Sequence, residues 1–214
     1  MRHFSAIDKV IRLFISGCAL SVLATYAGAL GNPPSWTEEM AKGRFPYHRL
    51  TAADFPINDA VHKEYAMHTE GFFWYHYNER WTENGGHAIA RITDWNVWSG
   101  FERDKSSRKS WLRKDQVERT LPHEQGHLDI NELFSKRLAD TPLEKLPTGE
   151  GNSGKEAEAD LARKMKAKAD RLAAEEKVEQ ERYDAETNHG ANAAKQQAWT
   201  AAIQTRLQHA GIHY

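Results

Sequence analysis

The chain has 214 residues, of which 40% are hydrophobic, and its 29 Lys and Arg nearly balance its 30 Asp and Glu, for a formal net charge of −1. This composition fits one globular domain with attachments and excludes a disordered tail. The basic residues are spread along the chain rather than gathered in a stripe, which argues against a nucleic-acid partner.

The N-terminal segment has the pattern of a signal peptide. Three basic residues precede an uncharged run, residues 13 to 30 (LFISGCALSVLATYAGAL), which ends in small residues. We expect cleavage after Ala29, so that residues 1–29 are removed. The mature protein, residues 30–214, is then periplasmic or secreted.

Two alternatives for this segment stay open. The uncharged run of about 18 residues is long enough to span a bilayer as an uncut anchor. Ile15-Ser-Gly-Cys18 resembles a lipoprotein cleavage box, although Arg12 leaves only a short apolar stretch before it. In each case the rest of the chain works outside the cytoplasm, and a membrane is a partner only through this segment.

Cys18 is the only cysteine, so the mature chain has neither disulfides nor thiolate ligands. A metal site must therefore be built from His, Asp and Glu.

The first part of the mature chain predicts a sheet. Residues 32 to 57 contain four Pro and are expected to form an extended arm with at most short elements. Two aromatic and β-branched runs follow, residues 66 to 77 (AMHTEGFFWYHY) and 87 to 98 (HAIARITDWNVW). The polar turn between them, residues 78 to 86, predicts a hairpin or two sheet strands.

The second part predicts helices. Residues 117 to 138 carry apolar side chains at helical spacing and should form an amphipathic helix that stops before Thr141-Pro142. Residues 141 to 154 are rich in Pro, Gly and Ser and predict a flexible loop. Residues 155 to 188 have the composition of a long, mostly solvated helix. Trp199, Ile203 and Leu207 mark a last amphipathic helix.

These elements together predict the α+β class: a small N-terminal antiparallel sheet, then a motif helix, a long charged helix and a C-terminal helix. We expect residues 30–214 to form a single domain. Its aromatic sheet part covers about residues 45–100, and its helical part about residues 110–210.

The residues that carry chemistry are His123-Glu-Gln-Gly-His127, an H-E-x-x-H match within the predicted motif helix. Residues i and i+4 share one helix face, so both imidazoles can reach one Zn²⁺ while Glu124 faces the adjacent water as general base. Pro122 suits a first turn, so we expect the helix to begin there, with Thr120 as a cap, or to be kinked. The alternative is a pair of surface histidines beside a solvated Glu.

A catalytic zinc site needs a third protein ligand and an open position. Ligand-capable residues gather in residues 183 to 190 (YDAETNHG), where His189 is the first choice and Asp184 or Glu186 the alternatives. Asp184 also suits a role as hydrogen-bond acceptor for a ligand imidazole. Tyr183 is a candidate oxyanion stabiliser, although packing is its alternative role. No ligand spacing supports the remaining histidines of the mature chain: His48, His62, His68, His76, His87, His209 and His213.

Residues 121 to 130 (LPHEQGHLDI) and 183 to 190, followed by Gln196 and Trp199, resemble a bacterial family known as a domain of unknown function and described as predicted secreted zinc-dependent proteases. Residues 50 to 55 (LTAADF) also resemble the N-terminal segment of that family. The likeness runs from about residue 36 to 208.

The resemblance implies zinc held by His123, His127 and His189, with Glu124 as the base. The chain departs from the family pattern at Pro122, where an apolar helix residue is expected, and in the charged insert of residues 150 to 180, which is longer than typical.

The sequence thus predicts an exported zinc-dependent metallopeptidase that cuts a peptide or protein substrate lying between the sheet and the motif helix. Its cofactor is Zn²⁺, and Glu124 activates a zinc-bound water. The alternative is a non-catalytic envelope binding or assembly protein whose metal site is structural or vestigial. The sequence leaves the substrate preference and the oligomeric state open.

Overall fold

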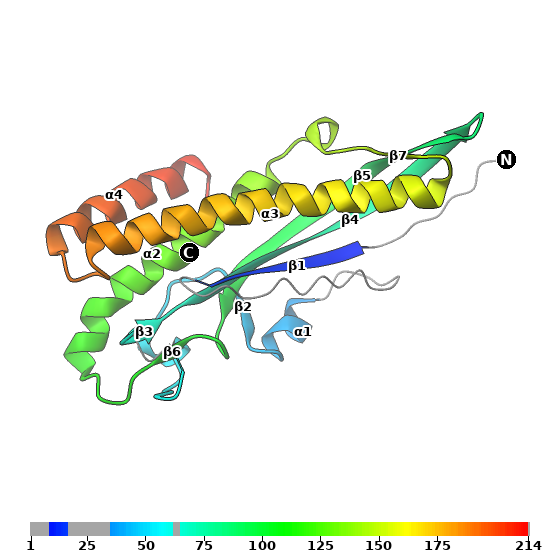
Figure 1. The fold of residues 1–214 in the computed structure, drawn as a ribbon. Helices are drawn as coiled ribbons and strands as arrows, with labels where there is room; N and C mark the ends of the chain where they lie inside the picture. Colours follow the sequence, from blue (N-terminus) through cyan, green and yellow to red (C-terminus); the bar gives the residue numbers. More distant parts are fainter. Residues whose placement is uncertain (1–8, 17–34, 62–64, 214) are drawn as a thin grey trace.

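The computed structural model describes residues 9–16, 35–61 and 65–213 (Figure 1). The predicted α+β class is confirmed, with antiparallel sheets followed by helices. The strands are β1 Lys9–Ser16, β2 Arg44–Pro46, β3 Met67–His68, β4 Glu70–Asn84, β5 His87–Glu102, β6 Ser107–Arg108 and β7 Gly149–Gly151. The helices are α1 Trp36–Met40, α2 Lys114–Ala139, α3 Gly154–Thr187 and α4 Ala193–His209, with short 3₁₀ helices at Ala52–Asp54 and Leu143–Lys145.

The long hairpin of β4 and β5 is the centre of the main sheet, whose strand order is β1-β4-β5-β2, with β7 also paired to β5. Alternate residues of β4, among them Phe73, Tyr75 and Tyr77, face the helices. A β-bulge shifts the register at Asn78/Glu79, where β5 contributes the extra residue Thr93. The apolar residues of β5 that face the helices have even residue numbers before the bulge and odd residue numbers after it. The bulge therefore keeps them all on the same face of the sheet.

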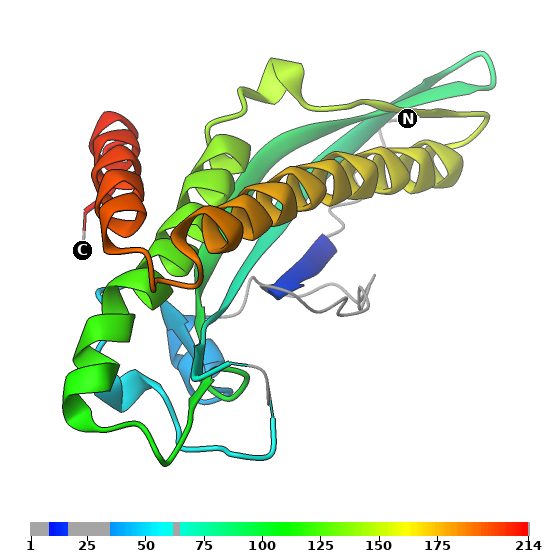
Figure 2. The same cartoon turned by 60° about the vertical axis from the view of Figure 1, so that its left-hand side comes forward.

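One face of this sheet is covered by helices (Figures 1 and 2). α3 runs along the hairpin, α2 crosses beside it, and α4 packs on the outer side of α2 and α3. The main core lies between them, and α3 contributes a buried stripe at helical spacing, from Ala157 through Leu161, Met165 and Ala169 to Leu172. A smaller core, which includes Leu50, Phe55 and Phe101, lies under the first half of α2.

The helix ends follow local chemistry. Ser153 and Asn192 cap α3 and α4 by accepting a hydrogen bond from the backbone of Glu156 and Lys195. Asn188 ends α3 in the left-handed conformation, with φ of 50°. Each cap is a residue type that competes well for exposed backbone groups, so these boundaries fall close to the predicted ones.

Three local expectations were wrong. The strands continue through most of the predicted turn, so only Gly85 and Gly86 connect them. The segment predicted as a flexible loop contains β7. Of the two alternatives for Pro122, a helix start there is wrong, because α2 begins at Lys114 and Pro122 lies inside it. α3 is the long helix that its composition predicts, exposed or partly exposed at most positions, with a buried stripe along its length.

The predicted signal peptide is only partly covered by the described residues. Its residues 9–16 form β1, which pairs antiparallel with β4 from Lys9 opposite Tyr77 to Ser16 opposite Glu70. The expected cleavage site after Ala29 and the lipoprotein box at Cys18 lie outside the described residues. Within the described part of the chain, no helix is both long enough and apolar enough to cross a membrane.

Candidate metal centre

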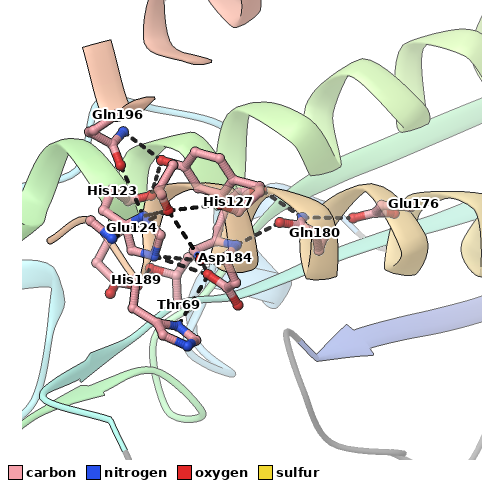
Figure 3. Close-up of polar contacts among 12 residues, drawn as sticks. Thr69, His123, Glu124, His127, Glu176, Gln180, Asp184, His189 and Gln196 are labelled. Atoms are coloured by element: carbon pink, nitrogen blue, oxygen red, sulfur yellow. Dashed lines mark hydrogen bonds and ion pairs between the residues drawn. The ribbon is translucent and has the colours of Figure 1, made fainter. Parts of the chain in front are cut away.

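His123 and His127 lie one turn apart on the buried face of α2 and direct their Nε2 atoms to the same point (Figure 3). These two nitrogen atoms are 3.2 Å apart. The surface-histidine alternative does not fit, because the side chain of His123 is 4% exposed and that of His127 is 12% exposed. The two rings are therefore part of a buried polar cluster between α2 and α3.

Gln180 of α3 forms two hydrogen bonds with His127. Its Oε1 lies 2.6 Å from Nδ1 of His127, and its Nε2 donates to the backbone carbonyl of the same residue at 2.9 Å. Because the amide nitrogen is committed to a carbonyl, Oε1 must face the ring and accept from an Nδ1–H. His127 thus carries its proton on Nδ1 and turns the Nε2 lone pair into the site.

Gln196 of α4 orients the ring of His123 in a similar way. Its Oε1 lies 3.1 Å from Nδ1 of His123, while its Nε2 donates to the hydroxyl of Tyr183 at 2.7 Å. That hydroxyl in turn donates to the backbone carbonyl of His123 at 3.1 Å. The amide orientation is again fixed from its far side, so the Nε2 lone pair of His123 also faces the site.

The carboxylate of Asp184, on α3, lies against the Nε2 atoms of both histidines. Its Oδ1 lies 3.1 Å from Nε2 of His123 and 2.9 Å from Nε2 of His127. Nδ1 of His189 is 3.5 Å from the same oxygen, and the side chain of His189 is 54% exposed at the edge of the site. One ligand atom each from His123, Asp184 and His189 lie within 4.8 Å of one another. The structure thus brings His189, the first choice for the third ligand, and Asp184, one of the alternatives, to the same site as His123.

Two inward nitrogen lone pairs beside a carboxylate oxygen repel one another unless a cation lies between them. In the absence of a metal, that cation is a proton. Burial lowers the pKa of His127, but the hydrogen bond and charge of Asp184 outweigh it and raise the pKa to about 9. For Asp184, burial raises the pKa, but hydrogen bonds from His123 and His127 hold it far below its usual range. Neutral imidazole and carboxylate are also the donors that zinc prefers when no thiolate is available, so this donor set fits the expected ion.

Glu124 lies beside the metal-ligand candidates and is 3% exposed. Its Oε2 accepts a hydrogen bond of 2.7 Å from the hydroxyl of Thr69, the residue between β3 and β4. Glu124 and Thr69 both line the adjacent pocket. This pocket of about 580 Å³ is lined by β3 on one side and by α2 and the end of α3 on the other.

The turn between α3 and α4 brings His189 to this pocket. Asn188, His189 and Gly190 all have positive φ, of 50°, 51° and 81°. A Cβ on Gly190 would lie 3.0 Å from Cβ of His123, so glycine allows this tight turn to pack on the metal-ligand candidate. The left-handed backbone conformation of His189 is strained for a non-glycine residue, and such strain is often found at functional sites.

The two remaining candidates, Glu186 and Tyr183, do not line the pocket. The carboxylate of Glu186 accepts a hydrogen bond from Nε1 of Trp199 at 2.9 Å, on the side of α3 that faces α4. Tyr183 is fully buried, and its hydroxyl proton is committed to the carbonyl of His123, which corrects its assignment as an oxyanion stabiliser. Tyr183 instead fixes α2 against α3.

Sequence reasoning missed Thr69, His68 and the supporting role of Gln180. His68 lines the pocket, and its Nε2 is 3.4 Å from Oε2 of Glu70, so it is not an isolated histidine. Neither Thr69 nor His68 belongs to a local motif that could have revealed it. Gln180 had a detectable pattern, since Glu176, Gln180 and Asp184 recur every four residues on one face of α3, and all are buried.

Comparisons of this chain with protein-family models, with curated proteins and with solved structures gave no match.

Proposed function

We propose that the protein is a zinc-dependent metallopeptidase that works outside the cytoplasm, as the resemblance to predicted secreted zinc-dependent proteases implies. The observation that carries this proposal is the convergence of the Nε2 atoms of His123 and His127 on Oδ1 of Asp184, beside the buried carboxylate of Glu124. An acid in this position, at the wall of a pocket, matches the arrangement that metal-assisted hydrolysis requires.

In this proposal His123 and His127 hold the ion together with Asp184 or His189. When bound, zinc supplies Lewis acidity, which polarises a carbonyl oxygen and makes water a stronger acid. Glu124 takes a proton from the attacking water at its carboxylate and later passes that proton to the leaving amine. The hydrogen bond from Thr69 holds the carboxylate in orientation during both transfers.

The first test is the metal content of the purified protein after dialysis, by elemental mass spectrometry. We expect about one zinc per chain, as one three-ligand site holds one ion. Absence of metal, even after zinc is added back, would contradict the proposal.

Glu124→Gln is the second test. We expect this variant to keep its zinc and to lose about 10²- to 10⁴-fold in the rate of cleavage of a mixed peptide library, because general-base catalysis contributes a factor of that size. Glu118→Gln, an exposed position on the same helix, is the matched control and should keep full activity. Full activity in Glu124→Gln would remove Glu124 as the base.

A second function has one observation in its favour. Asp184 approaches both motif histidines, and His189 lies with Asp184 and His123, so a site that used all four side chains would be closed to water. Such a site is structural and fits a binding or assembly protein of the cell envelope. The visible spectrum of the cobalt-substituted protein separates the two, because an open site changes its spectrum when azide is added and a closed one does not.

A further inference from the structure

A second hollow adjoins the metal pocket and is not used by the chemistry proposed above. It is a groove of about 870 Å³, a volume within the range of about 300–1,000 Å³ that is usual for ligand sites. Its walls are the segment before α2, the first half of α2, the turn after α3 and the first half of α4. The two hollows share Ala66, Thr120, His189 and Ala191 in their linings, so they lie side by side.

Apolar side chains form much of the groove lining. Trp111, Leu112 and Pro122 supply large apolar surface, and α4 presents the small residues Ala193 and Ala201. Trp111 is 63% exposed, although burial of an indole ring is favourable. An exposed ring of this size beside a continuous groove is typical of a binding surface.

The charged side chains among the described lining residues of the groove already have partners, and Nδ1 of His189 lies 3.5 Å from Oδ1 of Asp184. The other charged residue of the lining is Arg119, whose guanidinium group forms an ion pair of 2.8 Å with Asp115. Gln197 at the rim can hydrogen-bond to a peptide backbone. This lining disfavours charged side chains and suits a neutral, apolar one.

We propose that this groove binds the substrate residues next to the cleaved bond and selects an aromatic or large aliphatic side chain there, with Trp111 as a specificity-determining residue. This inference rests on the proposed peptidase function, because the occupant is argued from the residues that the groove shares with the metal pocket. A polypeptide that extends from the metal pocket past the shared residues Thr120 and His189 enters the groove with its neighbouring residues.

The test measures binding separately from cleavage. Zinc-loaded full-length protein with Glu124→Gln is titrated with two peptides that differ only in one central residue, Phe or Ser, in a Gly-rich background. We expect the Phe peptide to bind at least about tenfold more tightly, since burial of a Phe side chain is worth about 1.5–3 kcal/mol. Adding Trp111→Ala should reduce this ratio to about twofold. Val178→Ala, which alters an exposed apolar residue of α3 that does not line the groove, should keep it.

Equal binding of the two peptides, or a ratio that Trp111→Ala leaves unchanged, would overturn the inference. Self-association that Trp111→Ala abolishes, without an effect on peptide binding, would assign the groove to a second copy of the chain and overturn it as well. Cleavage assays on protein with Glu124 intact report on the function independently. Cleavage without a Trp111-dependent preference contradicts the groove alone, whereas Trp111-dependent binding without cleavage contradicts the peptidase function alone.

Discussion

At the scale of single residues, the two glutamines that orient His123 and His127 decide whether the centre is ready for a metal. Each amide is fixed from its far side, by a backbone carbonyl for Gln180 and by Tyr183 for Gln196. The imidazole tautomer is therefore set before an ion arrives, and the protein does not have to reorganise the rings on binding.

Gln180→Ala and Gln196→Ala should each weaken zinc binding by about 10- to 100-fold, because the imidazoles lose the partners that hold their orientation. Competition with a fluorescent chelator measures the change in Kd. Gln208→Ala, on the exposed side of α4, is the control and should bind zinc as the native protein does. Unchanged zinc affinity in both glutamine variants would contradict the conclusion that the glutamines set the imidazole tautomers.

Glu176 is a second residue whose environment predicts a measurable effect. Its Oε1 is 3.4 Å from Nε2 of Gln180, and its Oε2 has no hydrogen-bond partner among the described residues. Burial raises the pKa of Glu176 to about 8; the hydrogen bond from Gln180 opposes this effect, and the charges of Glu179 and Glu70 add to it. Glu176 is therefore protonated in the folded protein at neutral pH.

The folded state holds this proton more tightly than the unfolded state, so the contribution of Glu176 to stability is fully present below the ordinary pKa of about 4.5 and is lost as the pH rises toward about 8. Within this window the loss has a slope of up to about 1.4 kcal/mol per pH unit. Glu176→Gln removes the titration. Urea unfolding at pH 5 and pH 8 should show a smaller decrease in stability for the variant than for the native protein, and equal decreases would contradict the assignment.

At the scale of elements, the contact between α2 and α3 explains the glycine inside the motif. A Cβ at Gly126 would lie 2.3 Å from the hydroxyl oxygen of Tyr183, which is too close for any real contact. The glycine lets α3 approach α2 closely enough for Asp184 and Gln180 to reach the motif histidines. The motif and the long helix therefore depend on each other for their geometry.

Gly126→Ala should destabilise the fold by about 1–3 kcal/mol, the usual cost of overpacking, and should also weaken zinc binding because Tyr183 must move. Glu118→Ala on the exposed face of α2 introduces the same residue type without a clash and serves as control. Urea unfolding and a zinc titration measure the two effects. A stable variant with native zinc affinity would show that α3 adjusts without affecting the centre.

The elements that the sequence predicted well have strong local patterns. α3 and α4 are bounded by capping residues, and the hairpin strands have aromatic and β-branched runs. The errors occurred where tertiary contacts override local preference. β7 forms in a Pro- and Gly-rich segment because β5 offers an unpaired edge, and Pro122 is tolerated inside α2 because the helix is held by packing on both sides of it.

At the scale of the whole molecule, the candidate ligands join parts of the chain that are distant in sequence. His123 and His127 come from α2, Asp184 from α3 and His189 from the turn before α4. An ion bound by these residues links three segments that only the folded chain brings together, so metal binding and folding are coupled.

Removal of the metal should therefore lower the thermal stability. An ion present at 100 times its Kd stabilises the folded state by about 2.7 kcal/mol, which corresponds to about 5–10 °C in Tm for a domain of this size. Calorimetry with excess zinc and with chelator measures this shift. Asp184→Asn should show a smaller shift than the native protein, and identical Tm values with and without zinc in the native protein would contradict a metal bound at this site.

The sequence by itself determined the α+β class and the placement of His123, Glu124 and His127 on one helix, because helical periodicity and i, i+4 spacing are local properties. The tertiary structure decided which distant side chains meet them. The packing of α3 across α2 brings Asp184 and Gln180 to the histidines, and the start of β4 brings Thr69 to Glu124. These contacts depend on the close approach at Gly126 and on the turn at Gly190, which no local pattern specifies, because they arise from the fit between surfaces far apart in the chain.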